Sequence, residues 1–119
     1  MSDTKKNQPT DETATVKKAM ISQPMAGKTD EEIAAARDLA VAKLRQMGYE
    51  VADTVFNFAD EQLKALEVEN APVYYLGNSI QAMSRCTAMY FLKGWEGARG
   101  CKIEHEIAKA YGLEVLYEG

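Results

Sequence analysis

Residues Ala88–Gly112, AMYFLKGWEGARGCKIEHEIAKAYG, give the clearest indication of how this chain folds. Its first five residues, Ala88–Leu92, form an apolar run that predicts a buried strand. A glycine-rich loop carrying Trp95 follows, and a helix is expected from about Cys101 to Tyr111, where Gly112 ends it. A strand, an irregular glycine loop and a helix in this order build the binding crevice of open parallel α/β sheets.

The rest of the chain alternates strands and helices around this stretch. Further strands are expected at 16–22, 49–52 and 113–117, and helices at 29–47, around 61–66 and from 72 to near 86. In the first helix Thr29 and Glu32 predict a capping box, and Gly48 a stop. Its expected apolar stripe is Ile33, Ala36, Ala40, Leu44 and Met47. The alternation predicts an α/β, flavodoxin-like (Rossmann-like) three-layer sandwich with a four- to five-stranded parallel sheet.

Length and composition limit the possible classes of protein. Residues 1–15 lack apolar periodicity and are expected to form a disordered tail, which leaves one domain over residues 16–119. The net charge of −4 argues against a nucleic-acid partner. No apolar stretch approaches the roughly 20 residues that cross a bilayer, so no membrane partner is expected. A polar N-terminus and only two cysteines favour a cytoplasmic protein.

Three segments are expected to converge at the carboxyl edge of the sheet: Ser22–Thr29, Asp53–Phe58 and Lys93–Cys101. Glu104 is expected in the first turn of the last helix, at the edge of a buried stripe, so that it faces this crevice. The stripe is predicted to comprise Ile103, Ile107 and Ala110, with His105 turned to solvent. The Glu104 carboxylate could act on a ligand, or it could only stabilise the helix dipole by ~0.3–1 kcal/mol.

The segment Ser22–Thr29 (SQPMAGKT) differs from a Walker A phosphate loop at one consensus position. Ser22 replaces the first glycine, and Pro24 removes an N–H from the phosphate cradle, so a nucleoside triphosphatase is not predicted. Amide groups at the start of the helix could still bind a phosphate or a hydroxyl. Candidate ligand-binding residues here are Ser22, Gln23, Pro24, Met25 and Gly27.

The remaining candidates each have two interpretations. Trp95 either stacks on a base or covers local packing, Arg99 either binds a phosphate or is solvated, and Asp53 either holds a ribose hydroxyl or caps a turn. Cys101 either has a lowered thiol pKa at its helix N-terminus or is inert. The sole histidine, His105, has no partners at metal-ligand spacing, so neither a metal nor a cofactor is expected.

Two motifs resemble the nucleoside 2-deoxyribosyltransferase-like superfamily: Met20–Met25 (MISQPM) with Gly27, and Gly100–Ala108 (GCKIEHEIA) with Gly112. The nearest resemblance is to a small bacterial and phage branch with the signature Y-F-L-x-G-W-E-x-x-R-G-C-x-I-E-H. The resemblance implies a flavodoxin-like sheet and Glu104 as a nucleophile, which attacks C1′ of a 2-deoxyribonucleoside and displaces the base. The chemistry is that of a retaining glycosidase.

The chain departs from the superfamily pattern near the implied site. Ser79 stands where active members carry an aspartate, Thr87 replaces a frequent acid, and Glu106 replaces a small residue. The resemblance implies transfer or hydrolysis of the N-glycosidic bond of 2-deoxyribonucleosides or their 5′-monophosphates, whereas the missing aspartate favours a second function. The alternative is a non-catalytic nucleotide-binding module. The resemblance also implies a homo-oligomer.

Overall fold

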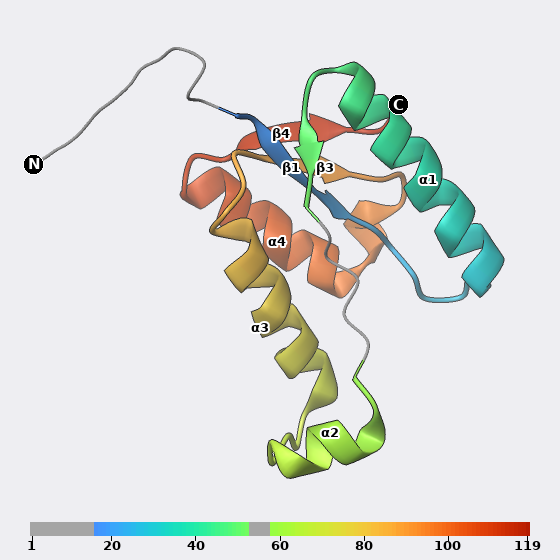
Figure 1. The fold of residues 1–119 in the computed structure, drawn as a ribbon, viewed down its shortest axis with the longest axis vertical. Helices are drawn as coiled ribbons and strands as arrows, with labels where there is room; N and C mark the ends of the chain where they lie inside the picture. The colour runs from blue at the N-terminus through green and yellow to red at the C-terminus, as the bar shows by residue number, and fades with distance from the viewer. Residues whose placement is uncertain (1–15, 53–57) are drawn as a thin grey trace, which may run out of the picture.

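A computed structural model describes residues 16–52 and 58–119, and its order of elements is the predicted one (Figure 1). The described elements are β1 (Lys18–Ser22), α1 (Asp30–Gln46), β2 (Glu50–Val51), α2 (Asp60–Ala65), α3 (Ala71–Met83), β3 (Ala88–Phe91), the 3₁₀ turn η2 (Trp95–Gly97), α4 (Arg99–Ala110) and β4 (Glu114–Tyr117). The four strands are parallel, in the order β2-β1-β3-β4. The predicted flavodoxin-like α/β sandwich is confirmed.

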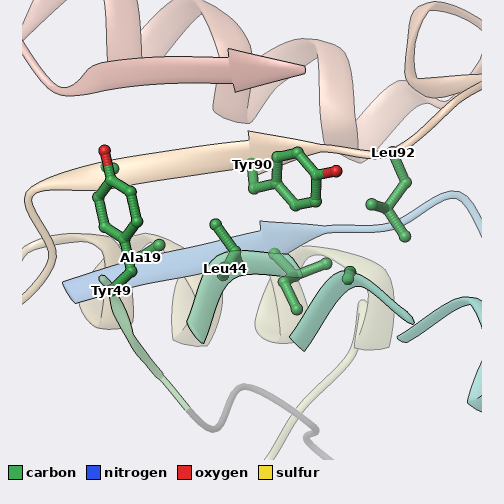
Figure 2. Close-up of a cluster of buried hydrophobic side chains, with 8 residues drawn as sticks. Ala19, Leu44, Tyr49, Tyr90 and Leu92 are labelled. Atoms are coloured by element: carbon green, nitrogen blue, oxygen red, sulfur yellow. The ribbon is translucent and has the colours of Figure 1, made fainter. Parts of the chain in front are cut away.

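Apolar side chains cover both faces of the sheet. Because successive residues of a strand point to opposite faces, Ala19 and Ile21 pack toward α1 while Met20 lies on the other face. Figure 2 shows part of the α1 face, with Ala19 and Tyr90 from the sheet against Leu44 of α1. The opposite cluster comprises Met20, Met83, Cys86, Met89, Phe91 and Ala108. Burial on both faces explains why β3 is apolar at every position.

The start of α1 confirms the predicted capping box. The Glu32 N–H donates to Thr29 Oγ1 at 3.1 Å, and the Thr29 N–H donates to Glu32 Oε1 at 2.9 Å. Gly48 follows the helix with a φ of 95°, a left-handed conformation that favours glycine. The predicted stripe is wrong at one end, because Met47 lies beyond the helix as its C-cap and is 44% exposed.

The last helix differs from the prediction in its start and in its buried face. It begins at Arg99, two residues early, so that Glu104 lies in the second turn. Its buried residues are Cys101, Glu104, His105 and Ala108, whereas the predicted stripe residue Ile103 is 39% exposed. The helix can bury Glu104 and His105 because each has a hydrogen-bond partner, Ser22 and Tyr117 respectively.

Helix α2 lies at the far end of the molecule from the sheet and contains no buried residue (Figure 1). Three aromatic rings hold this end together, since Phe58 lies 5.4 Å from Tyr74 and 5.7 Å from Tyr75 between ring centroids. The Tyr75 hydroxyl also accepts a hydrogen bond from the Phe58 N–H at 3.2 Å. The start of α3 is therefore held by ring packing against Phe58.

Candidate functional site

The Glu104 carboxyl is buried at the carboxyl end of β1. Only 7% of the residue is exposed, and its Oε1 accepts a hydrogen bond from the Ser22 hydroxyl at 2.6 Å. Ser22 is the last residue of β1 and is 2% exposed. The fold thus joins a strand end and a helix that are 82 residues apart in the chain.

The surroundings of Glu104 act on its pKa in opposite directions. Burial raises the pKa above its usual value, because it disfavours the charged form. The hydroxyls of Ser22 and Ser79 lower the pKa in part, by hydrogen bonding to that form. The pKa remains raised overall, and a desolvated carboxyl with specific polar partners is characteristic of functional sites.

A cavity of about 660 Å³ adjoins this carboxyl. Its volume falls within the range of small-molecule binding sites. The walls come from β1 and its following loop, from α1, from α3 and from the start of α4. The lining residues are Met20, Ile21, Gln23, Met25, Asp30, Ile33, Arg37, Pro72, Tyr75, Leu76, Ser79, Gly100 and Glu104.

Three predicted ligand-binding residues line this cavity with Glu104, namely Gln23, Met25 and Ser79. The side-chain amide of Gln23 donates from Nε2 to the carbonyl oxygen of Ile33 at 2.8 Å. Its Oε1 is buried without a hydrogen-bond partner in the described part of the chain. Since buried polar atoms are rarely left unpaired, this acceptor is suited to a donor from a ligand.

Other predicted residues shape the loops without lining the cavity. Pro24 lies against the loop after β3. A Cβ atom placed on Gly94 of that loop would be 3.6 Å from the Cγ of Pro24. Gly27 adopts a φ of 79° and is exposed. Arg99 is exposed at the start of α4, and Asp53 lies outside the described residues.

Trp95 belongs to an aromatic cluster of Phe91, Trp95, His105 and Tyr117. Its ring stacks on His105 with centroids 4.1 Å apart and lies 5.4 Å from Phe91. These contacts favour the local-packing interpretation of Trp95. The expectation that His105 faces solvent is wrong: it is 8% exposed, and its Nε2 lies 2.6 Å from the Tyr117 hydroxyl.

The two cysteines are free and buried. Burial raises the pKa of the Cys101 thiol, although a hydrogen bond with Ser22 lowers it in part, and the raised pKa favours the inert interpretation. Across residues 16–52 and 58–119, no group of three or more His, Cys, Asp or Glu side chains is arranged to hold a metal ion. Nor does this part of the chain contain a helix with the length and hydropathy of a membrane span.

Helix α1 contributes to the cavity wall, which the sequence does not predict. Asp30, Ile33 and Arg37 line it, and their spacing of three and four residues places them on one face of the helix. That spacing is visible in the sequence. It does not form an apolar stripe, however, because two of the three residues are charged. A charged helix residue is usually taken as solvent-exposed.

The fold and the cavity define a doubly wound α/β protein with a ligand-sized site at the carboxyl edge of its sheet. A family model described as "Domain of unknown function (DUF4406)" matches residues 17–117, and the chain belongs to this family. A search of curated proteins and a search of solved structures each gave no match.

Proposed function

We propose that this protein cleaves or exchanges the N-glycosidic bond of 2-deoxyribonucleosides or their 5′-monophosphates, with Glu104 as the nucleophile. One observation carries the proposal: a buried carboxyl, hydrogen-bonded to Ser22, borders a cavity large enough for a nucleoside. The resemblance of the surrounding motifs to the nucleoside 2-deoxyribosyltransferase-like superfamily supplies the reaction class.

In the proposed first step a Glu104 carboxylate oxygen forms a bond to C1′ of the sugar. The bond between C1′ and the base nitrogen breaks, and its electron pair leaves with the base, which takes up a proton from solvent; the water that attacks in the second step returns a proton to solvent. In the second step water cleaves the glycosyl ester, which gives the free sugar and restores the carboxylate. A second base attacking at C1′ instead would make the reaction a transfer.

The cavity walls suit a nucleoside. Ile33 and Leu76 supply apolar surface, and the Tyr75 ring supplies an aromatic one, on which a base can pack. The Oε1 of Gln23, which has no partner among the residues that the structure describes, can accept a hydrogen bond from a sugar hydroxyl or a base N–H group. Ser22 holds the nucleophile in place and favours its ionised form.

A second candidate function is a non-catalytic nucleotide-binding module. Ser79 lines the cavity where the resemblance places an aspartate, and a serine hydroxyl is a poor proton donor to a leaving base. General acid assistance is worth about 10²–10⁴ in rate, so its loss could leave binding without turnover. In that case Glu104 would accept hydrogen bonds from the sugar.

We also propose that the protein forms a homo-oligomer and is located in the cytoplasm. Helix α3 lines the cavity and also exposes Val73 (61%) and Ile80 (36%), apolar side chains that a second copy could cover. Two free, buried cysteines are compatible with a reducing compartment.

The test is incubation with a panel of 2-deoxyribonucleosides and their 5′-monophosphates, followed by chromatography of the free bases. We expect the wild type to release a base, and Glu104→Gln to lose the activity by about 10⁴-fold. Glu106→Gln is the matched control, because Glu106 is exposed on the same helix. Mass spectrometry should also detect a deoxyribosyl adduct on Glu104.

The binding module predicts a different result. The wild type would release no base, yet the nucleotides would raise its melting temperature, since a ligand of the native state stabilises it. Glu104→Gln would then preserve most of that stabilisation. Base release that survives Glu104→Gln undiminished would contradict Glu104 as the nucleophile.

A further inference from the structure

Arg37 places a cationic group in the same cavity as Glu104. It projects from α1 among the lining residues and is only half-exposed. Its Nη2 donates to the carbonyl oxygen of Ala52 at 3.4 Å. This contact uses one of the five N–H donors of a guanidinium group and tethers the side chain at the end of β2.

Holding a guanidinium partly out of water beside apolar walls costs free energy unless a partner compensates for the lost solvation. Within residues 16–52 and 58–119, the Ala52 carbonyl is the one acceptor of this guanidinium, at a long distance, so it compensates only in part. A planar guanidinium binds phosphate and carboxylate oxygens in pairs, which makes it the side chain best suited to an anionic group of a ligand.

The sheet sets the positions of Arg37 and Glu104 relative to each other. Strands β2 and β1 are neighbours, and neighbouring strands lie about 4.8 Å apart. Arg37 is tethered just beyond β2, and Glu104 is held at the end of β1. A ligand whose reacting carbon lies at Glu104 can therefore extend along the carboxyl edge of the sheet toward Arg37.

Asp30 supplies a contrasting charge in the cavity wall. It lies on the same face of α1, seven residues before Arg37, which corresponds to roughly 10 Å along the helix axis. An anionic group is attracted at Arg37 and repelled at Asp30. The two charges thus favour one orientation of an anionic ligand along α1.

We infer that Arg37 is a specificity-determining residue that binds an anionic substituent of the ligand. A 5′-phosphate, or a carboxylate at the same position, is then preferred to an uncharged 5′-hydroxyl. This inference rests on the proposed function for the identity of the ligand. Its physical basis, a half-buried guanidinium in the cavity of Glu104, is independent of whether the bound molecule is turned over.

The test compares wild type and Arg37→Gln with three ligands: a 2-deoxyribonucleoside, its 5′-monophosphate and its 5′-carboxylic acid analogue. Dissociation constants are measured by calorimetry, and KM and kcat where there is turnover. We expect Arg37→Gln to weaken binding of the monophosphate by about 10- to 100-fold and binding of the nucleoside by less than about threefold. The carboxylic acid analogue shows whether the site distinguishes phosphate from carboxylate.

Two control variants sharpen this comparison. Arg45→Gln removes an exposed arginine from the last turn of the same helix and should leave all three dissociation constants unchanged. Arg37→Lys keeps the charge but loses paired hydrogen bonding, and should give an intermediate loss. Circular dichroism and the melting temperature establish that each variant is folded before binding is measured.

Equal binding of nucleoside and monophosphate by the wild type would overturn the inference, as would an equal loss of both in Arg37→Gln. Failure of the proposed function gives a different pattern. No base would be released, while the preference for the monophosphate would still depend on Arg37. Inorganic phosphate provides a further check, because it should compete with the monophosphate in the wild type and not in Arg37→Gln.

Discussion

Glu104 and His105 are adjacent residues of α4, but their side chains lie in two different regions of the molecule. Both are buried, at 7% and 8% exposure, and both are hydrogen-bonded to a hydroxyl. Glu104 borders the cavity, whereas His105 is enclosed by the rings of Phe91, Trp95 and Tyr117. Burial of a polar side chain therefore does not by itself identify a functional group.

The two regions differ in what surrounds the polar atom. In the aromatic cluster, Trp95 and His105 stack at 4.1 Å and Phe91 meets His105 edge-on at 5.0 Å, so the ring packing adds to stability. At the cavity, the Glu104 carboxyl is desolvated and has open space beside it instead of close packing on every side. Its raised pKa reflects the free-energy cost of burying the ionised form. We expect the cluster to maintain the fold and the cavity to bind the ligand.

Of the variants that test the difference between the two regions, Trp95→Ala should have the largest effect, on the free energy of unfolding. It should destabilise the protein by about 2–3 kcal/mol, less than for a fully buried tryptophan because Trp95 is half-exposed. Urea denaturation measures the loss, and Trp95→Phe is the control that retains a ring. Ligand affinity of the folded protein should be unchanged. A folded Trp95→Ala variant that no longer binds nucleotides would instead favour base stacking by Trp95.

A smaller effect is expected from Ser22→Ala, which removes the hydroxyl that favours ionised Glu104. The acid limb of the pH–rate profile should move to higher pH, because the pKa of Glu104 rises further when this hydrogen bond is lost. Activity near neutral pH should fall about tenfold. Ser84→Ala changes an exposed serine and should leave the profile unchanged. An unmoved acid limb would show that Ser22 does not support the ionised form.

The smallest effect is expected for Glu104→Gln, which should change how the free energy of unfolding depends on pH. Because the pKa of Glu104 is raised by folding, its favourable contribution is present at low pH and is lost as pH rises through the raised pKa. The variant should therefore be more stable than wild type at neutral pH by about 1 kcal/mol. The difference should shrink on acidification, as thermal melts across pH can measure. Glu106→Gln, an exposed site, should show no such trend.

Much of the fold could be predicted from the sequence, because periodicity and capping are local signals. The apolar run Ala88–Leu92 predicts β3, which spans Ala88–Phe91, and the pair Thr29 and Glu32 predicts the start of α1. The start of α4 was predicted two residues late. Its N-cap, Ala98, makes no side-chain hydrogen bond, so that boundary carries no capping signal.

The candidate site could be predicted only in part. The sequence predicts that Ser22 and Glu104 lie at the same edge of the sheet, because strand ends and helix starts converge there, but it does not predict the hydrogen bond between them. Arg37 was missed, since a charged residue on a helix usually indicates a solvated face. The sequence does not predict the burial of His105 either. Its hydrogen-bond partner, Tyr117, lies in β4, and helix periodicity alone does not reveal such a partner.

Local signals in the chain are sufficient to specify the alternation of strands and helices and hence the layered parallel sheet. These features follow from apolar spacing and backbone preferences within short segments. Which polar side chains are buried, and what encloses them, depends instead on how distant segments pack in the folded molecule. Burial of a charge depends on hydrogen-bond partners that are far away in the chain, as Ser22 is from Glu104.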